Sequence, residues 1–329
     1  MTRRNFRLLS VLTLVLGFIW LANPAQAGAS GGTLRLVSEP GDAMHVVHSA
    51  FASARKSIDL EMYEFTDPAL EAQLGAKATS GVKVKVILDS DYERSYNQAA
   101  ATYLERHRVS VVWAPSSTIY HAKFAVIDGH ELLVGTGNFT SQYYATTRDF
   151  WIVDTQPSDV AAATSVFHAD LSGRTSVVSP GKDLIFSPGS ETALVDLINS
   201  ATATLQVENE EMDSYAITDA LDAAAGRGVD VTVVMTYSSE WTSAFNELKA
   251  AGVHVFVDHG ESPIYIHAKA ICADCAAGNA NARAFVGSEN FSTSSLDYNR
   301  ELGVLTSARS ITTPLTATLS ADAASAQPW

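Results

Sequence analysis

Two short stretches of the chain each place a lysine two residues after a histidine. The first is Ile119–Lys123 (IYHAK) and the second is Ile266–Lys269 (IHAK). On a β-strand, residues i and i+2 point to the same face, so the histidine and the lysine of each copy would address one ligand. An imidazole can act as nucleophile or proton donor, and an ammonium group neutralises a phosphate oxygen. Two such pairs in one chain predict a phosphate site built from two halves.

Each pair is followed by the same further residues in the same order. An aspartate comes five residues after the lysine, and a turn of small residues that ends in asparagine comes next. The first copy consists of His121, Lys123, Asp128, Gly135, Thr136 and Asn138, and the second of His267, Lys269, Asp274, Gly287, Ser288 and Asn290.

The two aspartates do not fit a catalytic triad. Each lies seven residues after its histidine, so on one continuous strand the two side chains would face opposite sides. We therefore expect Asp128 and Asp274 to fix the turn after the strand through side-chain hydrogen bonds. Gly135 and Gly287 are expected to have a structural role in the motif as well.

The segments that precede each motif alternate between strand and helix patterns, which is typical of a layered α/β sheet. The first half predicts strands over 33–37, 57–65, 82–88 and 109–113, and helices over 42–55, 66–80 and 92–106. The second half repeats this order, with strands over 204–208, 229–235 and 253–257 and helices over 191–200, 216–225 and 239–250.

The fold class that follows is α/β, with two similar halves that each contain a mixed β-sheet flanked by helices. We expect the halves to pack with pseudo-two-fold symmetry and the site to lie between them. They are placed at residues 28–172 and 183–310, joined by a link rich in Ser, Gly and Pro, with a C-terminal tail at 311–329.

The first 27 residues read as a signal peptide. Three arginines precede an apolar run from Leu8 to Ala22, and Ala25-Gln26-Ala27 forms an A-x-A cleavage site. We therefore expect a secreted protein, extracellular or periplasmic. Cleavage removes three Arg and no acid, so the formal charge moves from −14 to −17. So acidic a protein lacks the long-range field that attracts polyanions, which disfavours dedicated nucleic-acid binding.

The sequence has only two cysteines, Cys272 and Cys275. In an exported protein this spacing favours a local disulfide, because no thioredoxin-like pattern surrounds it and two thiolates alone do not make a zinc site. An acidic cluster in the second half invites a metal-site interpretation, but we expect structural or rim positions for it. Its members are Glu208, Glu210, Glu211 and Asp213.

The pattern H-x-K-x-x-x-x-D followed by G-[S/T]-x-N resembles the HKD motif of the phospholipase D superfamily, and both copies are complete. The resemblance extends over nearly all of the chain after residue 27 and implies the phospholipase D/nuclease-like fold. It implies a covalent phosphohistidine without metal or cofactor, with His121 as nucleophile and His267 as general acid. The sequence alone leaves the order of the two histidines open. The motif lysines would supply positive charge to the phosphate. Asn138 and Asn290 would supply neutral hydrogen-bond donors, and Thr136 and Ser288 would direct hydroxyl groups toward the substrate.

Two further acidic residues occupy equivalent places after the motifs. Asp149 lies 28 residues after His121. Glu301 lies 34 residues after His267, or 28 once the six-residue excess of the second copy is subtracted. A nucleophilic histidine needs an acceptor on its other ring nitrogen, and family members place an acidic residue here. We expect Asp149 and Glu301 to orient His121 and His267.

Three functions remain open. The first is a phospholipase D-like phosphodiesterase that hydrolyses or transphosphatidylates phospholipid headgroup esters, which we favour because the chain is exported and acidic. The second is a secreted nuclease that uses the same two histidines. The third is a non-catalytic phosphate-binding protein. Because both motifs lie in one chain, a monomer suffices, and a phospholipid substrate would involve only transient contact with a membrane surface.

Overall fold

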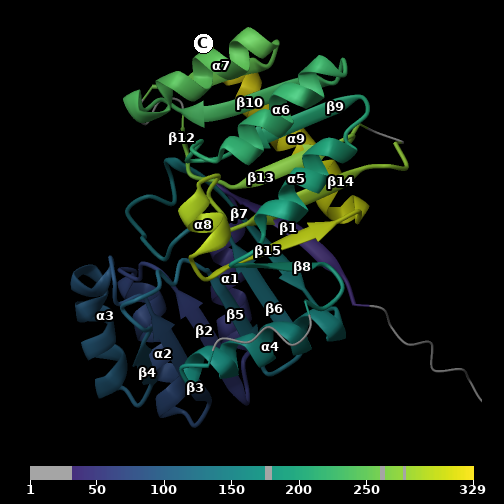
Figure 1. Cartoon of the computed structure of the whole chain (residues 1–329). Coiled ribbons are helices and arrows are strands. Elements are labelled where there is room, and N and C mark those ends of the chain that lie inside the picture. Colours follow the sequence, from purple (N-terminus) through teal and green to yellow (C-terminus); the bar gives the residue numbers. More distant parts are fainter. Residues whose placement is uncertain (1–31, 175–179, 260–263, 277–278) are drawn as a thin grey trace, which may run out of the picture. The chain divides into compact units, whose positions relative to one another are not determined.

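The computed structural model describes residues 32–174, 180–259, 264–276 and 279–329, and Figure 1 shows the whole chain. The chain from Gly32 to Trp329 forms one compact unit. The expected signal peptide, residues 1–27, lies outside the described residues, and so does part of the expected link, residues 175–179.

The segment before each motif folds as alternating strands and helices, as the sequence predicts. The strands of the first half are β1 (Leu34–Glu39), β2 (Ser57–Met62), β3 (Lys83–Leu88), β4 (Ser110–Trp113), β5 (Phe124–Ile127), β6 (Glu131–Gly135) and β7 (Thr147–Asp154). Its helices are α1 (Ala43–Ser53), α2 (Pro68–Thr79), α3 (Arg94–Arg106) and α4 (Pro157–Leu171).

The second half repeats this order. Its strands are β8 (Leu184–Ser187), β9 (Thr204–Glu208), β10 (Asp230–Thr236), β11 (His254–Asp258), β12 (Tyr265–Ile266), β13 (Ala270–Ala273), β14 (Arg283–Gly287), β15 (Glu301–Thr306) and β16 (Gln327–Pro328). Its helices are α5 (Glu191–Ser200), α6 (Tyr215–Gly226), the 3-10 turn η1 (Ser239–Trp241), α7 (Thr242–Ala251), α8 (Thr293–Asp297) and α9 (Arg309–Ser325).

The two sheets have the same strand order. The first runs β1-β7-β6-β5-β2-β3-β4, and the second runs β8-β15-β14-β13-β9-β10-β11 with β16 added at its edge. In both sheets the three strands connected by helices are parallel, and the other pairs along these orders are antiparallel. The short strand β12 of the second half adds a parallel pair with β7. Two mixed sheets with one topology confirm the predicted fold class.

Helix α2 shows how local sequence sets these elements. Asp67 caps it by accepting hydrogen bonds from the backbone N–H groups of Ala69 and Leu70 at 2.8 and 3.3 Å. Pro68 occupies the first turn, where its missing N–H costs nothing. Gly81 follows the helix with φ +102°, a conformation that L side chains rarely adopt. The helix therefore ends where the sequence predicts.

The halves share a central hydrophobic core. Apolar residues of both sheets meet there, among them Phe124 of the first half and Val286 of the second, together with Phe167 from α4 and Leu315 from α9. Helices α1–α3 cover the other face of the first sheet, and α5–α7 cover the other face of the second. In Figure 1, α2 and α3 accordingly lie at the opposite end of this unit from α6 and α7.

Residues 311–329 do not form the tail that the sequence suggests. They belong to α9 and β16, and β16 pairs with β11. Helix α9 is the counterpart of α4. Helix α4 follows β7 and α9 follows β15, which occupy equivalent places in the two sheets, and each helix carries a buried aspartate. Asp170 of α4 binds Arg300 at 2.8 Å, and Asp322 of α9 binds Arg148 at 2.7 Å. Each helix thus anchors the residue that precedes a site carboxylate of the other half.

The motif aspartates have a structural role, but at a different turn from the one we expect. Asp128 accepts from the N–H groups of Lys56 and Ser57 at 2.6 and 2.8 Å, and from a third N–H, so it holds the loop before β2. Asp274 does the same before β9, where it accepts from the N–H of Thr204 at 3.0 Å. Their φ values are +53° and +54°, a region that aspartate tolerates better than most residues.

Cys272 and Cys275 form a disulfide, with an S–S distance of 2.07 Å. Both residues are buried, and Cys272 lies on β13 within the shared core. The disulfide closes the turn that follows β13, at the opposite end of this strand from Lys269. It stabilises the scaffold and does not take part in the histidine–lysine cluster.

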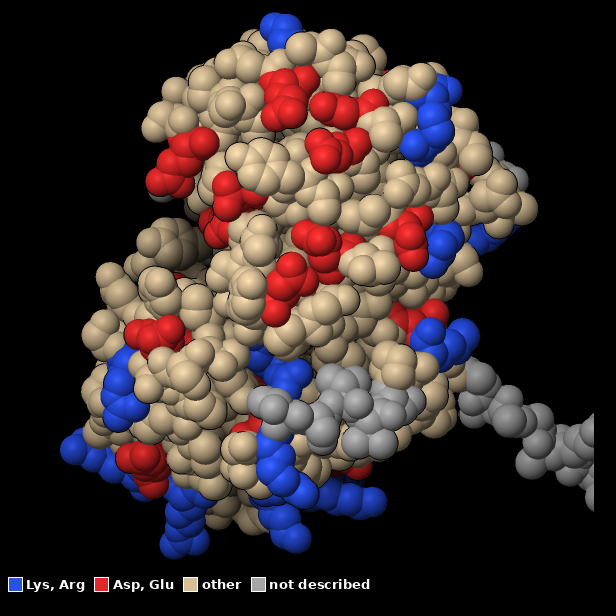
Figure 2. Space-filling model, viewed as in Figure 1, with Lys and Arg blue, Asp and Glu red and all other residues tan. Residues whose placement is uncertain are grey.

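Charge is distributed unevenly over the surface. On the face shown in Figure 2, Lys and Arg gather mainly over the part of the first half where α2, α3 and β3 lie, whereas Asp and Glu spread over the second half. None of the helices in the described ranges is both long enough and apolar enough to span a membrane.

Candidate active site

The histidines and lysines of the two motifs lie just before β5 and β13, not within a strand as the sequence suggests. Backbone hydrogen bonds to the other half hold them there. The N–H groups of His121 and Ala122 both donate to the carbonyl oxygen of Arg300 at 2.9 Å. In the second half, β12 pairs in parallel with the start of β7, where Ile266 lies opposite Arg148. Each motif histidine is therefore fixed beside the buttressing carboxylate of the opposite half.

The two carboxylates consequently pair with the histidines in a crossed arrangement. Glu301 lies 2.8 Å from Nδ1 of His121, and Asp149 lies 2.9 Å from Nδ1 of His267. Counting residues from each motif suggests pairing within each half, which is wrong. The crossing follows from the backbone contacts above, because residues 300 and 148 immediately precede the two carboxylates. One site is thus shared by both halves.

The motif hydroxyls position these carboxylates and do not face a substrate, contrary to our expectation for Thr136 and Ser288. Both side chains are fully buried. Thr136 donates to Asp149 through Oγ1, and the Oγ of Ser288 accepts from the N–H of Leu302 at 3.1 Å. Glu301 is held by the hydroxyl of Ser295 at 2.6 Å.

The motif glycines permit close packing behind the site. A Cβ on Gly135 would lie 2.7 Å from the Trp151 ring, and one on Gly287 would lie 2.5 Å from the Cα of Gly303. A side chain at either position would push its strand away from the neighbouring strand that carries the carboxylate.

Both motif lysines are buried, and each donates to the backbone carbonyl of the histidine two residues before it. Lys123 lies under the ring of Tyr63, with Nζ 4.8 Å from the ring centroid. Lys269 instead binds the carboxylate of Glu210 at 3.0 Å. The two ammonium groups thus have different neighbours although their motifs match.

The asparagines at the ends of the motif turns lie beside two cavities. Asn138 lines a cavity of about 350 Å³ next to His267, and Asn290 lines one of about 250 Å³ next to His121. The amide oxygen of each asparagine is buried without a hydrogen-bond partner. The amide nitrogen of Asn290 donates to Glu211 at 3.0 Å.

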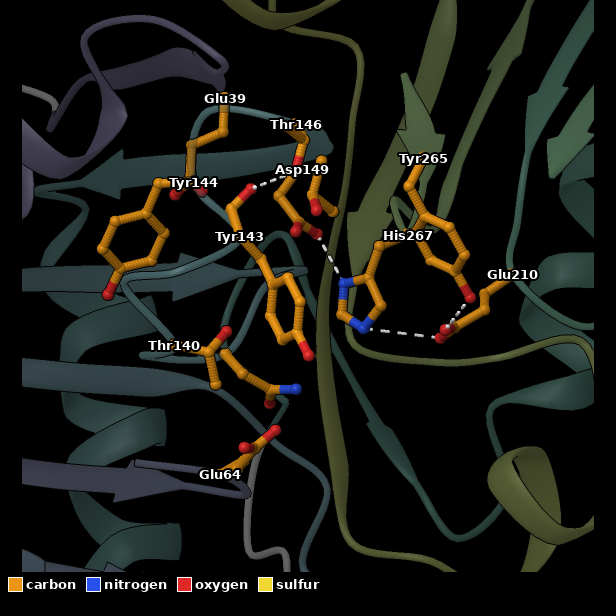
Figure 3. Close-up of a pocket in the computed structure, with 12 residues that line it drawn as sticks. Glu39, Glu64, Thr140, Tyr143, Tyr144, Thr146, Asp149, Glu210, Tyr265 and His267 are labelled. Atoms are coloured by element: carbon orange, nitrogen blue, oxygen red, sulfur yellow. Dashed lines mark hydrogen bonds and ion pairs between the residues drawn. The ribbon is translucent and has the colours of Figure 1, made fainter. Parts of the chain in front are cut away.

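Figure 3 shows the larger cavity, in which His267 stands between Asp149 and Glu210. Carboxylates and phenol groups dominate its lining, and no lysine or arginine is among the described residues that line it. The acidic lining residues are Glu39, Glu64, Asp149 and Glu210, and the tyrosines are Tyr143, Tyr144 and Tyr265.

Burial and charge give the first-half pair unusual protonation. Burial lowers the pKa of His121 to about 4, although Glu301 opposes this effect. Burial also lowers the pKa of Lys123 to about 7. Burial would raise the pKa of Glu301, but His121 and Lys123 hold it below its usual range. His121 is therefore neutral near pH 6, with Nδ1–H donated to Glu301 and the lone pair of Nε2 free for attack.

These pKa values predict an acidic optimum for kcat/KM. Protonation of His121 removes its lone pair, and deprotonation of Lys123 removes a phosphate-binding charge. Activity should therefore fall below about pH 4 and above about pH 7. A pH profile measured at low substrate concentration tests this, because kcat/KM reports the free enzyme. Lys123→Arg should move the upper limit to higher pH, since arginine keeps its charge; an unmoved limit would contradict the assignment to Lys123.

Sequence reasoning missed Glu210 as a site residue, since we place it in a rim or structural cluster. It lies inside the site, 3.4 Å from Nε2 of His267. Glu208 is fully buried elsewhere, near Asp322 and Arg148. The signal for Glu210 in the sequence is the internal repeat. The repeat aligns Glu210 with Tyr63 at the end of the equivalent strand.

Across the described ranges, no group of three or more His, Cys, Asp or Glu side chains is arranged to hold a metal ion.

Comparison with known proteins shows which family the chain resembles. Residues 47–171 and 194–323 match the family model described as "Cardiolipin synthase, PLD-like domain". A mitochondrial cardiolipin hydrolase from Xenopus tropicalis is 34% identical over 96 residues, which are 29% of this chain and 45% of that protein. The chain spans less than half the length of the curated relatives it matches.

Two solved structures share the fold over most of the chain. A phosphatidylserine synthase from Haemophilus influenzae aligns with a TM-score of 0.67 and 10% identity, covering 90% of this chain and 87% of that one. A polyphosphate kinase from Porphyromonas gingivalis aligns with a TM-score of 0.66 and 16% identity, covering 88% of this chain and 50% of that one. With both halves matched by the family model and both motifs assembled in one site, the chain belongs to the phospholipase D superfamily of phosphodiester-active enzymes, in the family of cardiolipin synthase PLD-like domains.

Proposed function

We propose that this chain is a secreted phospholipase D-type phosphodiesterase that cleaves the headgroup ester of a phospholipid through a phosphohistidine. The observation that carries the proposal is the convergence of His121 and His267 from the two halves. Each has its Nδ1 tied to a carboxylate, at 2.8 and 2.9 Å, and a buried lysine beside it. Such a pair supplies a nucleophile, a proton donor and cations for the equatorial phosphate oxygens.

In the first step, Nε2 of His121 attacks phosphorus while the bond from phosphorus to the headgroup oxygen breaks. The proton on Nε2 of His267 passes to that oxygen, so the headgroup leaves as an alcohol and not as an alkoxide. Lys123 and Lys269 neutralise the non-bridging oxygens, and the amides of Asn138 and Asn290 add hydrogen bonds. The neutral form of His121 suits it to the first role, and Glu301 stabilises the positive charge that its ring gains.

In the second step, water attacks phosphorus and gives a proton to Nε2 of His267, and the phosphorus–nitrogen bond breaks. His121 leaves as a neutral imidazole, and His267 regains the proton it lost. An alcohol in place of water would give transphosphatidylation by the same route. Both histidines thus return to their starting protonation states, and the side chains named fill each role, so the scheme assigns no step to a metal or cofactor.

The lining of the larger cavity supports a lipid headgroup over a nucleic acid. The leaving group must lie next to the proton donor, His267, and so enters this cavity. Four carboxylic side chains line it and no lysine or arginine does among the described residues, so a second phosphate would find no positive partner there. On the face in Figure 2, acidic side chains also spread over the second half. A headgroup without excess negative charge fits these surroundings.

The remaining proposals follow from the sequence. The basic and apolar start of the chain, with Ala25-Gln26-Ala27, supports export and cleavage. One chain carries both motifs, so a monomer that contacts a membrane surface transiently can carry out the reaction.

Phosphatidylcholine vesicles and single-stranded DNA, assayed side by side, test the function. We expect release of choline and phosphatidic acid, no cleavage of DNA, and unchanged rates with a chelator present. His121→Asn is the control for contaminating activity. Cleavage of DNA alone would replace the lipid proposal with a nuclease, and binding of vesicles without turnover would indicate a non-catalytic protein.

A further inference from the structure

One position breaks the symmetry of the two half-sites. Asp128 accepts a hydrogen bond from the N–H of Ser57, and Asp274 accepts one from the N–H of Thr204. Ser57 and Thr204 are therefore equivalent positions in the two repeats. Six residues after each anchored serine or threonine, the chain carries Tyr63 in the first half and Glu210 in the second. These two side chains face the histidine and lysine of their own half, so the repeat presents a neutral phenol to one pair and a carboxylate to the other.

The contacts differ accordingly. The ring of Tyr63 packs edge-on against His121 at 4.5 Å between centroids. Glu210 places Oε2 at 3.4 Å from Nε2 of His267 and 3.0 Å from Nζ of Lys269, while its Oε1 accepts from Tyr265 at 3.0 Å. Its side chain is 26% exposed and faces the larger cavity.

In their direct ion-pair contacts, the two pairs therefore differ by one carboxylate. In the first half, His121 and Lys123 have Glu301 as their adjacent anion. In the second half, His267 and Lys269 have Asp149 at Nδ1 of the imidazole and Glu210 between Nε2 of the imidazole and the ammonium group of Lys269. Burial would raise the pKa of Glu210, yet the adjacent His267 and Lys269 hold it below its usual range, so it is ionised.

We propose that Glu210 is a positioning residue that keeps the proton on Nε2 of His267, and so makes His267 the acid and leaves His121 as the nucleophile. This inference rests on the proposed phosphodiesterase function. A protonated imidazole between two carboxylates is stabilised by both charges. At 3.4 Å the contact between Glu210 and Nε2 is longer than an ordinary hydrogen bond. The carboxylate therefore stabilises the proton by its charge without a hydrogen bond that would prevent transfer of the proton to the substrate.

The consequence is measurable, because a proton donor matters only when the leaving group needs one. Choline leaves as an alkoxide unless it is protonated, whereas p-nitrophenol leaves readily as its anion. Phosphatidylcholine and phosphatidyl-p-nitrophenol therefore differ in their need for His267 while they share the phosphatidyl group that His121 attacks.

The experiment measures release of the two alcohols in a single turnover, which isolates the first step. Glu210→Gln should slow choline release about 100-fold, within the range for general acid catalysis, and p-nitrophenol release less than about threefold. Glu210→Asp, which keeps the charge, should recover part of the choline rate. Asp213→Asn removes one exposed charge three residues away and should leave both rates unchanged.

Each other outcome overturns the inference. Equal losses on both substrates would mean a general structural effect of Glu210. Faster choline release would mean that its carboxylate competes with the substrate phosphate for Lys269, and an unchanged rate would mean no role in the first step. If the native chain released neither alcohol, the proposed function itself would be overturned. This result differs from one in which the native chain is active and the Glu210 variants do not behave as expected.

Discussion

Replacing His121 with asparagine is expected to abolish cleavage of every phosphodiester, by a factor on the order of 10⁴ or more, as for other covalent nucleophiles. Asparagine is polar but has no ring nitrogen that can attack phosphorus. The loss should be the same for substrates with good and poor leaving groups, because both depend on attack by Nε2 of His121. Steady-state kcat on phosphatidylcholine and phosphatidyl-p-nitrophenol provides the measurement.

His254→Asn is the matched control for this loss. His254 is an exposed histidine on β11, paired with Asp230 at 3.5 Å and outside the site. Its replacement should leave kcat unchanged, and the urea unfolding midpoint of His121→Asn should show that the fold persists. Retention of even a tenth of native activity by a folded His121→Asn protein would refute the role of nucleophile.

Glu301→Gln is expected to slow turnover by about 10²- to 10⁴-fold, by analogy with loss of the carboxylate that orients a catalytic imidazole. Glu301 is fully buried, and it contacts His121 of the opposite half, whose ring it orients. Glutamine keeps the shape but removes the charge that stabilises the developing imidazolium. kcat/KM for the single and double variants measures the effect.

A double-mutant cycle tests the crossed arrangement directly. Two residues that act as a unit show strongly non-additive effects, whereas independent residues add. Glu301→Gln should add little to His121→Ala but should act nearly independently of His267→Ala. Asp149→Asn should show the reverse pattern. Coupling of Glu301 with His267 instead would mean that each carboxylate serves the histidine of its own half.

The sequence predicts the elements well because their signals are local. Asp67-Pro68 begins α2 and Gly81 follows it, and the alternation of strands and helices before each motif yields two equal sheets. The motif spacing also identifies Asp149 and Glu301 as equivalent residues. These features depend on neighbours within a few residues or on counting between repeats, and neither requires knowledge of how the halves pack.

The crossed carboxylates could not be predicted in this way, because they depend on how one half docks on the other. His121 reaches Glu301 across 180 residues of chain, and the backbone contact with Arg300 fixes them side by side. The resemblance to the HKD motif implies that Thr136 faces the substrate, yet its hydroxyl is buried and donates to Asp149.

The sequence does not predict helix α9, for a different reason. Its sequence is rich in Ala, Ser and Thr and contains Pro314, so neither its propensity nor its apolar pattern is strong. Packing on the shared core, through residues such as Leu315, stabilises it instead.

We propose that His121, oriented from the opposite half, forms a covalent bond to the substrate phosphorus. The most direct test quenches the native protein during turnover of phosphatidylcholine and maps the modified peptide by mass spectrometry under conditions that preserve phosphohistidine. We expect a phosphatidyl group on His121, absent in His121→Asn and accumulating when His267→Asn reacts with phosphatidyl-p-nitrophenol. A modified His267, or turnover by a protein in which no covalent species forms, would contradict the claim.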